Sequence, residues 1–369
     1  MPNTESNSGG TPAKGELTGS GASGRFPTFP QLDGFRGLAV VLVLFEHTLK
    51  HSLKLPGIWD HFGNLGVILF FGLSGFLITG LLCAEWERKG RIDLRAFYVR
   101  RALRIVPAMY ALLVVMALLK VVGWVTDVGW VGFAEAGLFI RNLVGRDTTL
   151  SHLWSVSIEM QYYVFWPLVF VLFGVRGAWR WGWGICLGVV AWRTLAVVGR
   201  HMPADAPSLY LRTDYRLDAI MAGSLLALSW KTGLAAWWRD PAPAWARWLH
   251  PGWMFPALVA WSYYGLDVPA LNSQWITGQV LLAVGLLAYS VRYGESWFAR
   301  LCRMEWLRYL GRLSYSLYLW QQVFLVTRGP DWGWFRRFPA NLALVCVLAV
   351  LSNLLVEKPF LRMKDWWRR

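Results

Sequence analysis

The chain has 369 residues, of which 56% are hydrophobic and 16% charged, and its mean hydropathy is +0.37. A soluble domain of this size needs more polar surface, so the composition excludes an ordinary soluble protein and predicts an integral membrane protein. The net charge of +15 suggests nucleic-acid binding at first, but the basic residues fall between apolar segments, where the positive-inside rule accounts for them. We therefore expect a lipid bilayer around the chain and no nucleic-acid partner.

The chain begins with a polar segment, which ten apolar runs follow. Residues 1–30 are rich in Gly, Ser, Thr, Pro and Asn, which predicts a disordered cytoplasmic tail and no cleavable signal peptide. The apolar runs, each read as a crossing of a ~30 Å hydrocarbon core, cover residues 36–53, 64–82, 104–125, 152–173, 180–198, 217–230, 251–266, 275–291, 310–327 and 338–356. The sequence thus predicts an all-α integral membrane protein with about ten transmembrane helices. They form one domain over residues 31–362, with a short basic tail over residues 363–369.

The segment 130–144 is apolar but short, and it contains Glu135, Arg141 and Asn142. We interpret it as a re-entrant or interfacial piece, with an extra span as the alternative. With the N-terminus in the cytoplasm, most of the 37 Lys and Arg residues fall in cytoplasmic segments, and both termini come out cytoplasmic. The four cysteines form no CxxC pair, so they predict neither a disulfide framework nor a metal site.

The first predicted span carries ionisable residues, which are costly inside a membrane and usually functional. Arg36 opens the span, and Glu46 and His47 lie well inside it. Arg36 and His47 are eleven positions apart, which at about 100° per residue returns them to nearly the same helix face, about 16 Å apart along the axis. This polar stripe is typical of a reaction path.

Seven short segments, in their order along the chain, resemble the acyltransferase-3 family of multi-pass membrane O-acyltransferases. They are Leu32–Gly37 leading to His47, Gly66–Thr79, Phe97–Pro107, His152–Tyr163, Tyr215–Ala219, Leu310–Trp320 and Val356–Phe360. The resemblance covers about residues 30–362. It implies transfer of an acyl group, expected to be acetyl, from cytoplasmic acyl-CoA to a hydroxyl of a carbohydrate or glycan acceptor at or across the membrane. It further implies a multi-pass protein of a bacterial inner membrane, with acyl-CoA as a substrate and no permanently bound cofactor.

The resemblance also assigns residues to the reaction. The family's essential histidine falls on His47 and its first-span arginine on Arg36, which would serve the donor or the developing oxyanion. An imidazole titrates near the operating pH, which suits His47 as the general base that removes the hydroxyl proton; the alternative is a structural histidine bonded to another helix. The family's arginine motif and its serine-tryptophan-glutamate pattern fall on Arg100, Arg101 and Arg104, and on Trp154, Ser155 and Glu159.

The three arginines offer bidentate partners for the phosphates of coenzyme A, although arginines at the end of a span also set topology. Glu159 would orient or pair with His47, or hold an arginine. The predicted acceptor-binding residues, at the outer face, are His152, Trp154, Ser155 and Arg216. We disfavour Ser74 as a covalent nucleophile, because no base is fixed beside it in the sequence and the nearby glycines indicate close helix packing.

The chain departs from the usual family pattern at three positions. Glu46 stands where a hydrophobic or aromatic residue is normal, and either tunes His47 or faces another helix. Met160 replaces a second carboxylate, and Gln321 stands where a histidine is frequent, which removes one possible polar contact.

A transporter or flippase for a lipid-linked glycan is the alternative function. Transporters often contain paired halves with interrupted helices, and the sequence contains no such symmetry. A non-catalytic scaffold would leave Arg36, His47 and Glu159 without a role.

Overall fold

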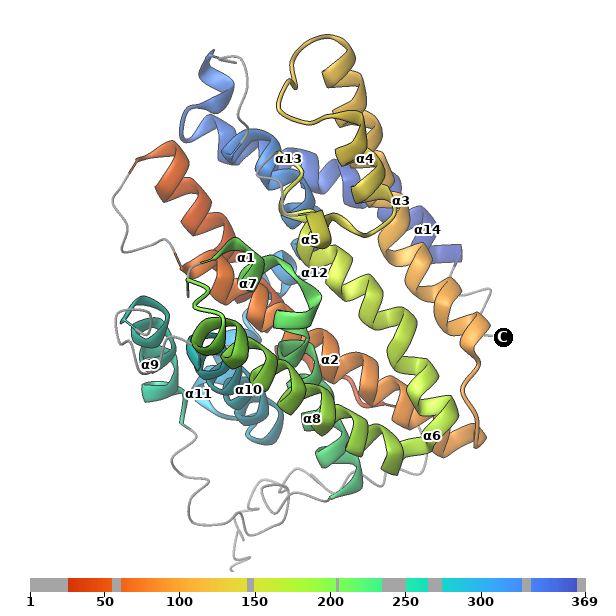
Figure 1. The fold of residues 1–369 in the computed structure, drawn as a ribbon. Coiled ribbons are helices and arrows are strands. Elements are labelled where there is room, and N and C mark those ends of the chain that lie inside the picture. The colour runs from red at the N-terminus through yellow and green to blue at the C-terminus, as the bar shows by residue number, and fades with distance from the viewer. Residues whose placement is uncertain are drawn as a thin grey trace, which may run out of the picture.

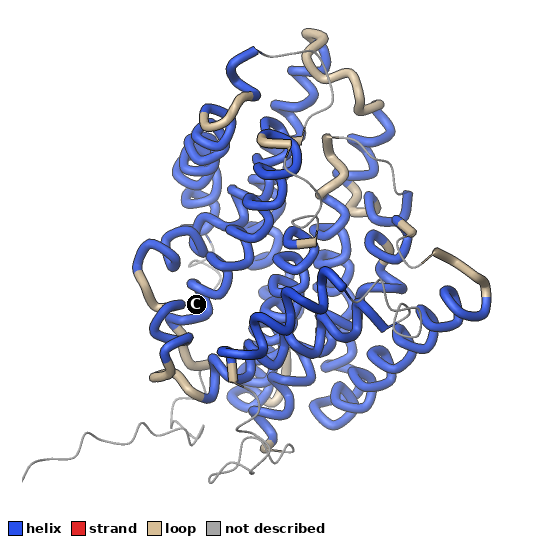
Figure 2. The backbone as a smooth tube through the Cα atoms, turned by 90° about the vertical axis from the view of Figure 1, so that its left-hand side faces the viewer, coloured by secondary structure: helices blue, strands red, loops and turns tan. Residues whose placement is uncertain are grey.

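A computed structural model describes residues 26–54, 61–144, 149–203, 206–233, 250–264, 274–326 and 333–363. Within these ranges the chain folds into helices joined by loops and turns, and it contains no β-strand (Figure 2). The predicted all-α class is therefore confirmed. The tail predicted for residues 1–30 lies mostly outside the described residues, but Phe26 and Phe29 pack edge-on against Phe76 and Trp230.

The helices follow one another along the chain as shown in Figure 1. They are α1 (Pro30–His47), α2 (Phe62–Lys89), α3 (Leu94–Val121), α4 (Trp130–Gly137), α5 (Arg141–Val144), α6 (Leu153–Thr194), α7 (Pro207–Leu211), α8 (Thr213–Thr232), α9 (Pro251–Tyr264), α10 (Trp275–Arg292), α11 (Trp297–Cys302), α12 (Glu305–Leu325), α13 (Ala340–Ser352) and α14 (Lys358–Met363). Wider π-helical turns follow α1, α6 and α13, at Thr48–Ser52, Leu195–Gly199 and Asn353–Glu357, and a 3₁₀ turn covers Gly333–Arg336.

Local sequence signals explain several of the helix ends. Helix α2 ends at Gly90, whose φ of 64° lies in the left-handed region that glycine adopts without strain. Helix α3 begins after Asp93, whose side chain accepts a hydrogen bond from the backbone N–H of Ala96 at 2.9 Å. Helix α6 breaks at Gly174, where φ is 62°, and its second part runs back toward α7 (Figure 1). This break separates the two predicted runs 152–173 and 180–198.

Each of the ten predicted runs falls largely on helical chain. In the described part of the chain, five helical segments are long and apolar enough to cross a membrane: Phe62–Lys89, Leu94–Val121, Leu153–Gly199, Trp275–Arg292 and Ala340–Met363. Helix α1 is long enough, but Asp33, Arg36 and Glu46 interrupt its apolar surface. The number of ten spans and the orientation of the termini stay predictions.

The segment 130–144 forms two short helices. Helix α4 has 8 residues and α5 has 4. Eight residues extend about 12 Å, which is far less than the hydrocarbon core, so the interpretation as an extra span is wrong. The alternative of a re-entrant or interfacial piece agrees with these lengths.

Helix α2 packs between α1 on one side and α8 on the other, and α12 packs along α1. Glycines allow these close approaches: a Cβ atom at Gly75 would lie 1.9 Å from the carbonyl oxygen of Ile220, and one at Gly311 would lie 1.7 Å from the carbonyl oxygen of Asp33. Small residues at such crossings are the usual device for close helix packing in membranes, so the close packing predicted at the glycines beside Ser74 is confirmed.

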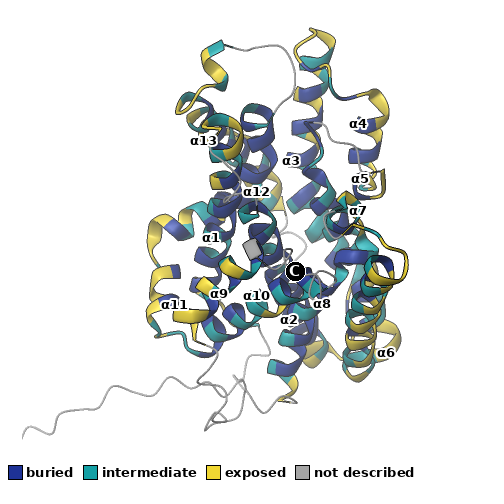
Figure 3. Ribbon diagram, turned by 60° about the vertical axis from the view of Figure 1, so that its left-hand side comes forward, coloured by how far each residue is buried: buried dark blue, intermediate teal, exposed yellow. Residues whose placement is uncertain are grey.

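Large apolar side chains lie on the outside of the molecule, and polar groups lie within it. Val114 and Leu118 of α3 and Phe165 and Leu172 of α6 are 58–71% exposed. Figure 3 shows exposed residues along the outward faces of peripheral helices such as α4 and α6. An exposed apolar surface around buried polar groups is the arrangement that a bilayer requires.

Candidate active site

Two pockets lie end to end inside the helix bundle. The first, here called the arginine pocket, has a cavity volume of about 90 Å³ and is lined by Arg36 of α1, Arg101 and Arg104 of α3, and residues of α2, α6 and α12. The second, here called the histidine pocket, has a cavity volume of about 620 Å³ and contains His47. Val67 and Tyr318 line both pockets and so form the partition between them.

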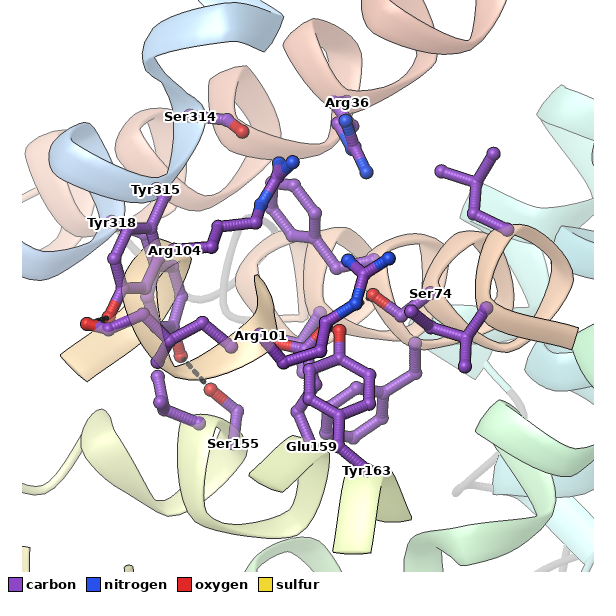
Figure 4. Close-up of a pocket in the computed structure, with 17 residues that line it drawn as sticks. Arg36, Ser74, Arg101, Arg104, Ser155, Glu159, Tyr163, Ser314, Tyr315 and Tyr318 are labelled. Atoms are coloured by element: carbon purple, nitrogen blue, oxygen red, sulfur yellow. Dashed lines mark hydrogen bonds between the residues drawn. The ribbon is translucent and has the colours of Figure 1, made fainter. Parts of the chain in front are cut away.

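The guanidinium groups of Arg36, Arg101 and Arg104 point toward one another in the arginine pocket (Figure 4). Arg36 has a distant carboxylate partner, with its Nη1 3.8 Å from Oδ1 of Asp33. Among the described residues, Arg101 and Arg104 form no ion pair with a carboxylate. The lining contains three guanidinium groups against one carboxylate, that of Glu159, and this excess of positive charge makes the pocket a favourable place for an anion.

Glu159 is the carboxylate that lines the arginine pocket, and it is engaged by hydroxyl groups. The Oγ of Ser74 and the phenol of Tyr163 both donate hydrogen bonds to its Oε1. The possible partnership of Glu159 with His47 is wrong, because among the described residues Glu159 is bonded to Ser74 and Tyr163, whereas His47 is bonded to Gln321. Ser74 has a carboxylate partner after all, which the sequence could not reveal because the two residues are 85 positions apart.

Arg100 does not join the other two members of its motif. It is directed to Glu85 of α2, with 3.6 Å between Arg100 Nη2 and Glu85 Oε2. Consecutive residues of a helix point about 100° apart, and in α3 this turns Arg101 toward the arginine pocket and Arg100 toward Glu85. Of the three arginines predicted to bind phosphate, Arg101 and Arg104 line the arginine pocket, together with Arg36 of α1. Their role as phosphate ligands stays a prediction.

His47 lines the second pocket and has a partner from a distant helix. Its Nδ1 lies 2.6 Å from Oε1 of Gln321 on α12. With the amide oxygen toward the ring, Nδ1 carries the hydrogen and Nε2 keeps its lone pair. The sequence had suggested that glutamine at this position removes a polar contact, and the structure corrects this: Gln321 makes one, and makes it with the predicted base.

Glu46, the residue next to His47 that departs from the family pattern, lies on α1 and contacts the beginning of α2. Its Oε2 accepts a hydrogen bond from the backbone N–H of Gly63, in the first turn of that helix. A carboxylate satisfies the free N–H groups of a helix N-terminus and complements its dipole. Of the two readings of Glu46, the one in which it faces another helix is therefore confirmed.

The predicted acceptor-binding residues lie in and around the histidine pocket. His152 and Trp154 line it, and Nε2 of His152 lies 3.0 Å from the backbone oxygen of Leu319. Ser155 lines the arginine pocket instead, and its Oγ lies 2.6 Å from the hydroxyl of Tyr318 at the partition.

Arg216 is completely buried behind the wall of the histidine pocket. Its Nη2 donates to Oδ1 of Asn64 at 2.7 Å, and its guanidinium lies 5.8 Å from the centre of the Trp154 ring. Its Nε and Nη1 have no hydrogen-bond partner in the part of the chain that the structure describes. Arg216 thus does not line the pocket itself, but it contacts two residues that do, Asn64 and Trp154.

Sequence reasoning missed the tyrosines of the arginine pocket, which are Tyr163, Tyr315 and Tyr318. A signal was present for one of them, because Tyr163 follows Glu159 by four positions and such residues meet on one helix face. Tyr315 and Tyr318 lie inside the segment Leu310–Trp320, whose resemblance to the family assigns no role to its individual residues.

Comparison of the sequence with known proteins finds a matching family model and several relatives. A family model described as an acyltransferase domain matches residues 29–357. A protein of Staphylococcus aureus strain COL that carries the provisional name O-acetyltransferase is 28% identical to this chain, over 90% of the chain and 57% of its own length.

Two further relatives have peptidoglycan in their names. The peptidoglycan O-acetyltransferase OatA of Listeria monocytogenes is 27% identical over 89% of this chain and 55% of its own length. YrhL of Bacillus subtilis strain 168, provisionally named a peptidoglycan O-acetyltransferase, is 28% identical over 89% of this chain and 54% of its own length. The chain thus spans little more than half the length of these relatives. No solved structure matches it significantly.

Proposed function

The chain belongs to the acyltransferase-3 family and is an acyltransferase, and from this premise we propose which group it transfers, and how. It moves an acetyl group from cytoplasmic acyl-CoA to a hydroxyl of a carbohydrate or glycan acceptor, with His47 as the general base. The protein resides in the inner membrane of a bacterial cell, spans it with about ten helices and keeps both termini in the cytoplasm.

The arginine pocket supports the choice of donor. Coenzyme A carries a pyrophosphate and a ribose phosphate, and arginine binds phosphate in a bidentate, charge-assisted geometry. Arg101 and Arg104 offer such groups from the cytoplasmic end of a predicted span, and neither pairs with a carboxylate among the described residues. Their charge is thus available to an anionic donor.

The histidine pocket and the relatives support the choice of acceptor. Two of the relatives named above are called peptidoglycan O-acetyltransferases, and peptidoglycan is a glycan. The histidine pocket is much larger than the arginine pocket, and Trp154 and Tyr210 line it. Aromatic rings beside polar groups suit a sugar, which has apolar faces and polar edges.

The transfer joins the two pockets at their partition. The acceptor oxygen attacks the thioester carbonyl, Nε2 of His47 takes its proton, the carbon–sulfur bond breaks and the thiolate of coenzyme A leaves. Arg36 and His47 are about 16 Å apart along α1. A donor bound by its phosphates among the arginines would therefore extend its pantetheine arm toward Val67 and Tyr318 to bring the thioester within reach of His47.

The substitution His47→Ala tests the role of the base. We expect it to abolish ester-linked acetate on the cell-envelope glycans, measured by mass spectrometry, while expression and membrane insertion persist. His51→Ala is the matched control, because His51 is exposed and its ring centre lies 6.0 Å from that of His47. Near-normal acetylation by His47→Ala would contradict the proposal. Glycan transport without consumption of acyl-CoA would instead favour the transporter.

A further inference from the structure

The proposed base has one hydrogen-bond partner in the described part of the chain. Gln321 Oε1 lies 2.6 Å from His47 Nδ1, across the contact between α12 and α1 and 274 positions away in sequence. Gln321 is completely buried. The two helices approach closely at Gly311, so the backbone that carries Gln321 is held firmly against the backbone that carries His47.

A structural role alone does not explain a glutamine at this position. Its Nε2 is buried and has no hydrogen-bond partner among the described residues. A buried donor without a partner costs free energy, and an apolar side chain such as methionine would fill the same space without that cost. What glutamine adds at this site is the carbonyl oxygen that faces the ring of His47.

That oxygen selects one form of the imidazole. An acceptor beside Nδ1 requires the hydrogen to be on Nδ1, which leaves the lone pair on Nε2. The reverse form, with hydrogen on Nε2, would set two lone pairs against each other at Nδ1 and could not take a proton at Nε2. The same oxygen continues to accept the hydrogen bond after Nε2 has been protonated.

We propose that Gln321 is the positioning residue that holds His47 in its reactive form, an inference that rests on the function proposed above. The acceptor oxygen forms its bond to the acyl carbon while its proton passes to Nε2 of His47, and the carbon–sulfur bond of the thioester breaks. The proton then leaves Nε2 for the departing thiolate or for water. Gln321 keeps the ring orientation and the Nδ1 hydrogen constant throughout.

The other polar groups near His47 do not take over this role. Lys50 and His51 follow it on the same segment, and His152, the N-cap residue of α6, lines the same pocket. The carboxylate of Glu46 accepts from the backbone of Gly63. None of these groups makes a hydrogen bond to the ring of His47 in the described part of the chain, so the identity of residue 321 should decide which nitrogen is reactive.

Three variants of the full-length protein test the proposal in membrane vesicles supplied with labelled acetyl-CoA and an envelope-glycan fraction. Gln321→Met keeps the length of the side chain and removes the acceptor oxygen. We expect kcat to fall about 10–100-fold, a part of the ~10²–10⁴-fold that a positioned general base contributes, with the KM for acetyl-CoA unchanged. Gln31→Met is the control, because Gln31 is also buried, on α1, but lines neither pocket.

Gln321→Glu should change the pH–rate profile, which would stay unchanged if Gln321 only filled space. It keeps an acceptor oxygen, so we expect it to retain more activity than Gln321→Met. Its negative charge favours the protonated imidazole, so the acidic limb of the pH–rate profile should move to higher pH. This variant also protects the test against a Gln321→Met protein that merely fails to fold.

Two results would overturn the inference. One is a wild-type kcat for Gln321→Met. The other is an equal loss in Gln321→Met and Gln321→Glu with the wild-type pH profile in both, which would indicate packing alone. The proposed function fails separately, through the activity of His47→Ala. A dead His47→Ala protein beside a fully active Gln321→Met protein would reject only the role of Gln321.

Discussion

At the scale of the residue, groups that neighbour each other in the sequence have different partners in the fold. Arg100 turns to Glu85, while Arg101 enters the arginine pocket. His47 and Glu46 both line the histidine pocket, but the ring of His47 lies against Gln321, while the carboxylate of Glu46 accepts from the backbone of Gly63. A motif therefore names a short stretch of chain, but its individual side chains serve different partners, because adjacent positions on a helix face different directions.

The division between Arg100 and Arg101 leads to a prediction about the donor. Replacing Arg101 with glutamine should raise the KM for acetyl-CoA about tenfold, the loss expected when a charged hydrogen bond to phosphate is removed. Arg100→Gln should leave this KM nearly unchanged, because Arg100 is held by Glu85. Steady-state kinetics with varied acetyl-CoA measure both values. An equal increase of this KM in both variants would contradict the prediction. It would show that the donor responds to the total charge of the motif and not to the position of Arg101 in the pocket.

At the scale of the element, the position of each helix depends on a few close contacts. Gly75 of α2 meets the backbone of α8 at Ile220, and Gly311 of α12 meets the backbone of α1 at Asp33. These crossings bring together the helices that carry Ser74, His47 and Gln321. The glycines thus position the site without taking part in its chemistry.

The crossing of α2 and α8 can be tested with an added methyl group. Gly75→Ala places a Cβ atom 1.9 Å from the carbonyl oxygen of Ile220, so the helices must separate, at a cost of about 1–3 kcal/mol. We expect a lower temperature of unfolding for the purified protein in detergent. Gly188→Ala is the control, because a Cβ atom at Gly188 meets nothing within 4 Å and alanine is the better helix former. An unchanged unfolding temperature for Gly75→Ala would show that this crossing is loose.

At the scale of the whole molecule, the two pockets meet at a partition formed by Val67 and Tyr318. In the proposed reaction the thioester lies at this partition, with the phosphates of the donor on one side and the acceptor on the other. Tyr318 is fixed there by hydrogen bonds to Ser155 and to the backbone oxygen of His152. The space beside Val67 should therefore limit the length of the transferred acyl group.

This arrangement predicts a change in donor preference. Val67→Ala should raise kcat/KM for butyryl-CoA relative to acetyl-CoA by about tenfold, since discrimination by a methylene-sized contact has that order of magnitude. Competition between the two donors, followed by mass spectrometry of the acylated glycans, measures the ratio. Val114→Ala serves as the control, because Val114 is on the outer surface of α3 and 58% exposed. The same ratio in all three proteins would mean that the acyl group binds elsewhere.

Several features followed from the sequence because they are local. Hydropathy and length placed the apolar runs that became helices, and the ionisable residues of the first run marked the helix that contributes to both pockets. The order of the short motifs identified the family over most of the chain. A helix needs only the residues of its own segment, so its presence can be read from that segment.

The partners of the candidate site were decided by the tertiary structure. Gln321 meets His47 across 274 positions, and Ser74 meets Glu159 across 85. The sequence contains each of these residues but does not show which side chains are in contact. Contacts between helices depend on the rotation of each helix about its axis and on the distance to its neighbours. The sequence alone therefore determined an acyltransferase-like helical membrane protein with a polar first helix. Only the packing of the helices separated its arginines from its histidines into two pockets and gave the proposed base its partner.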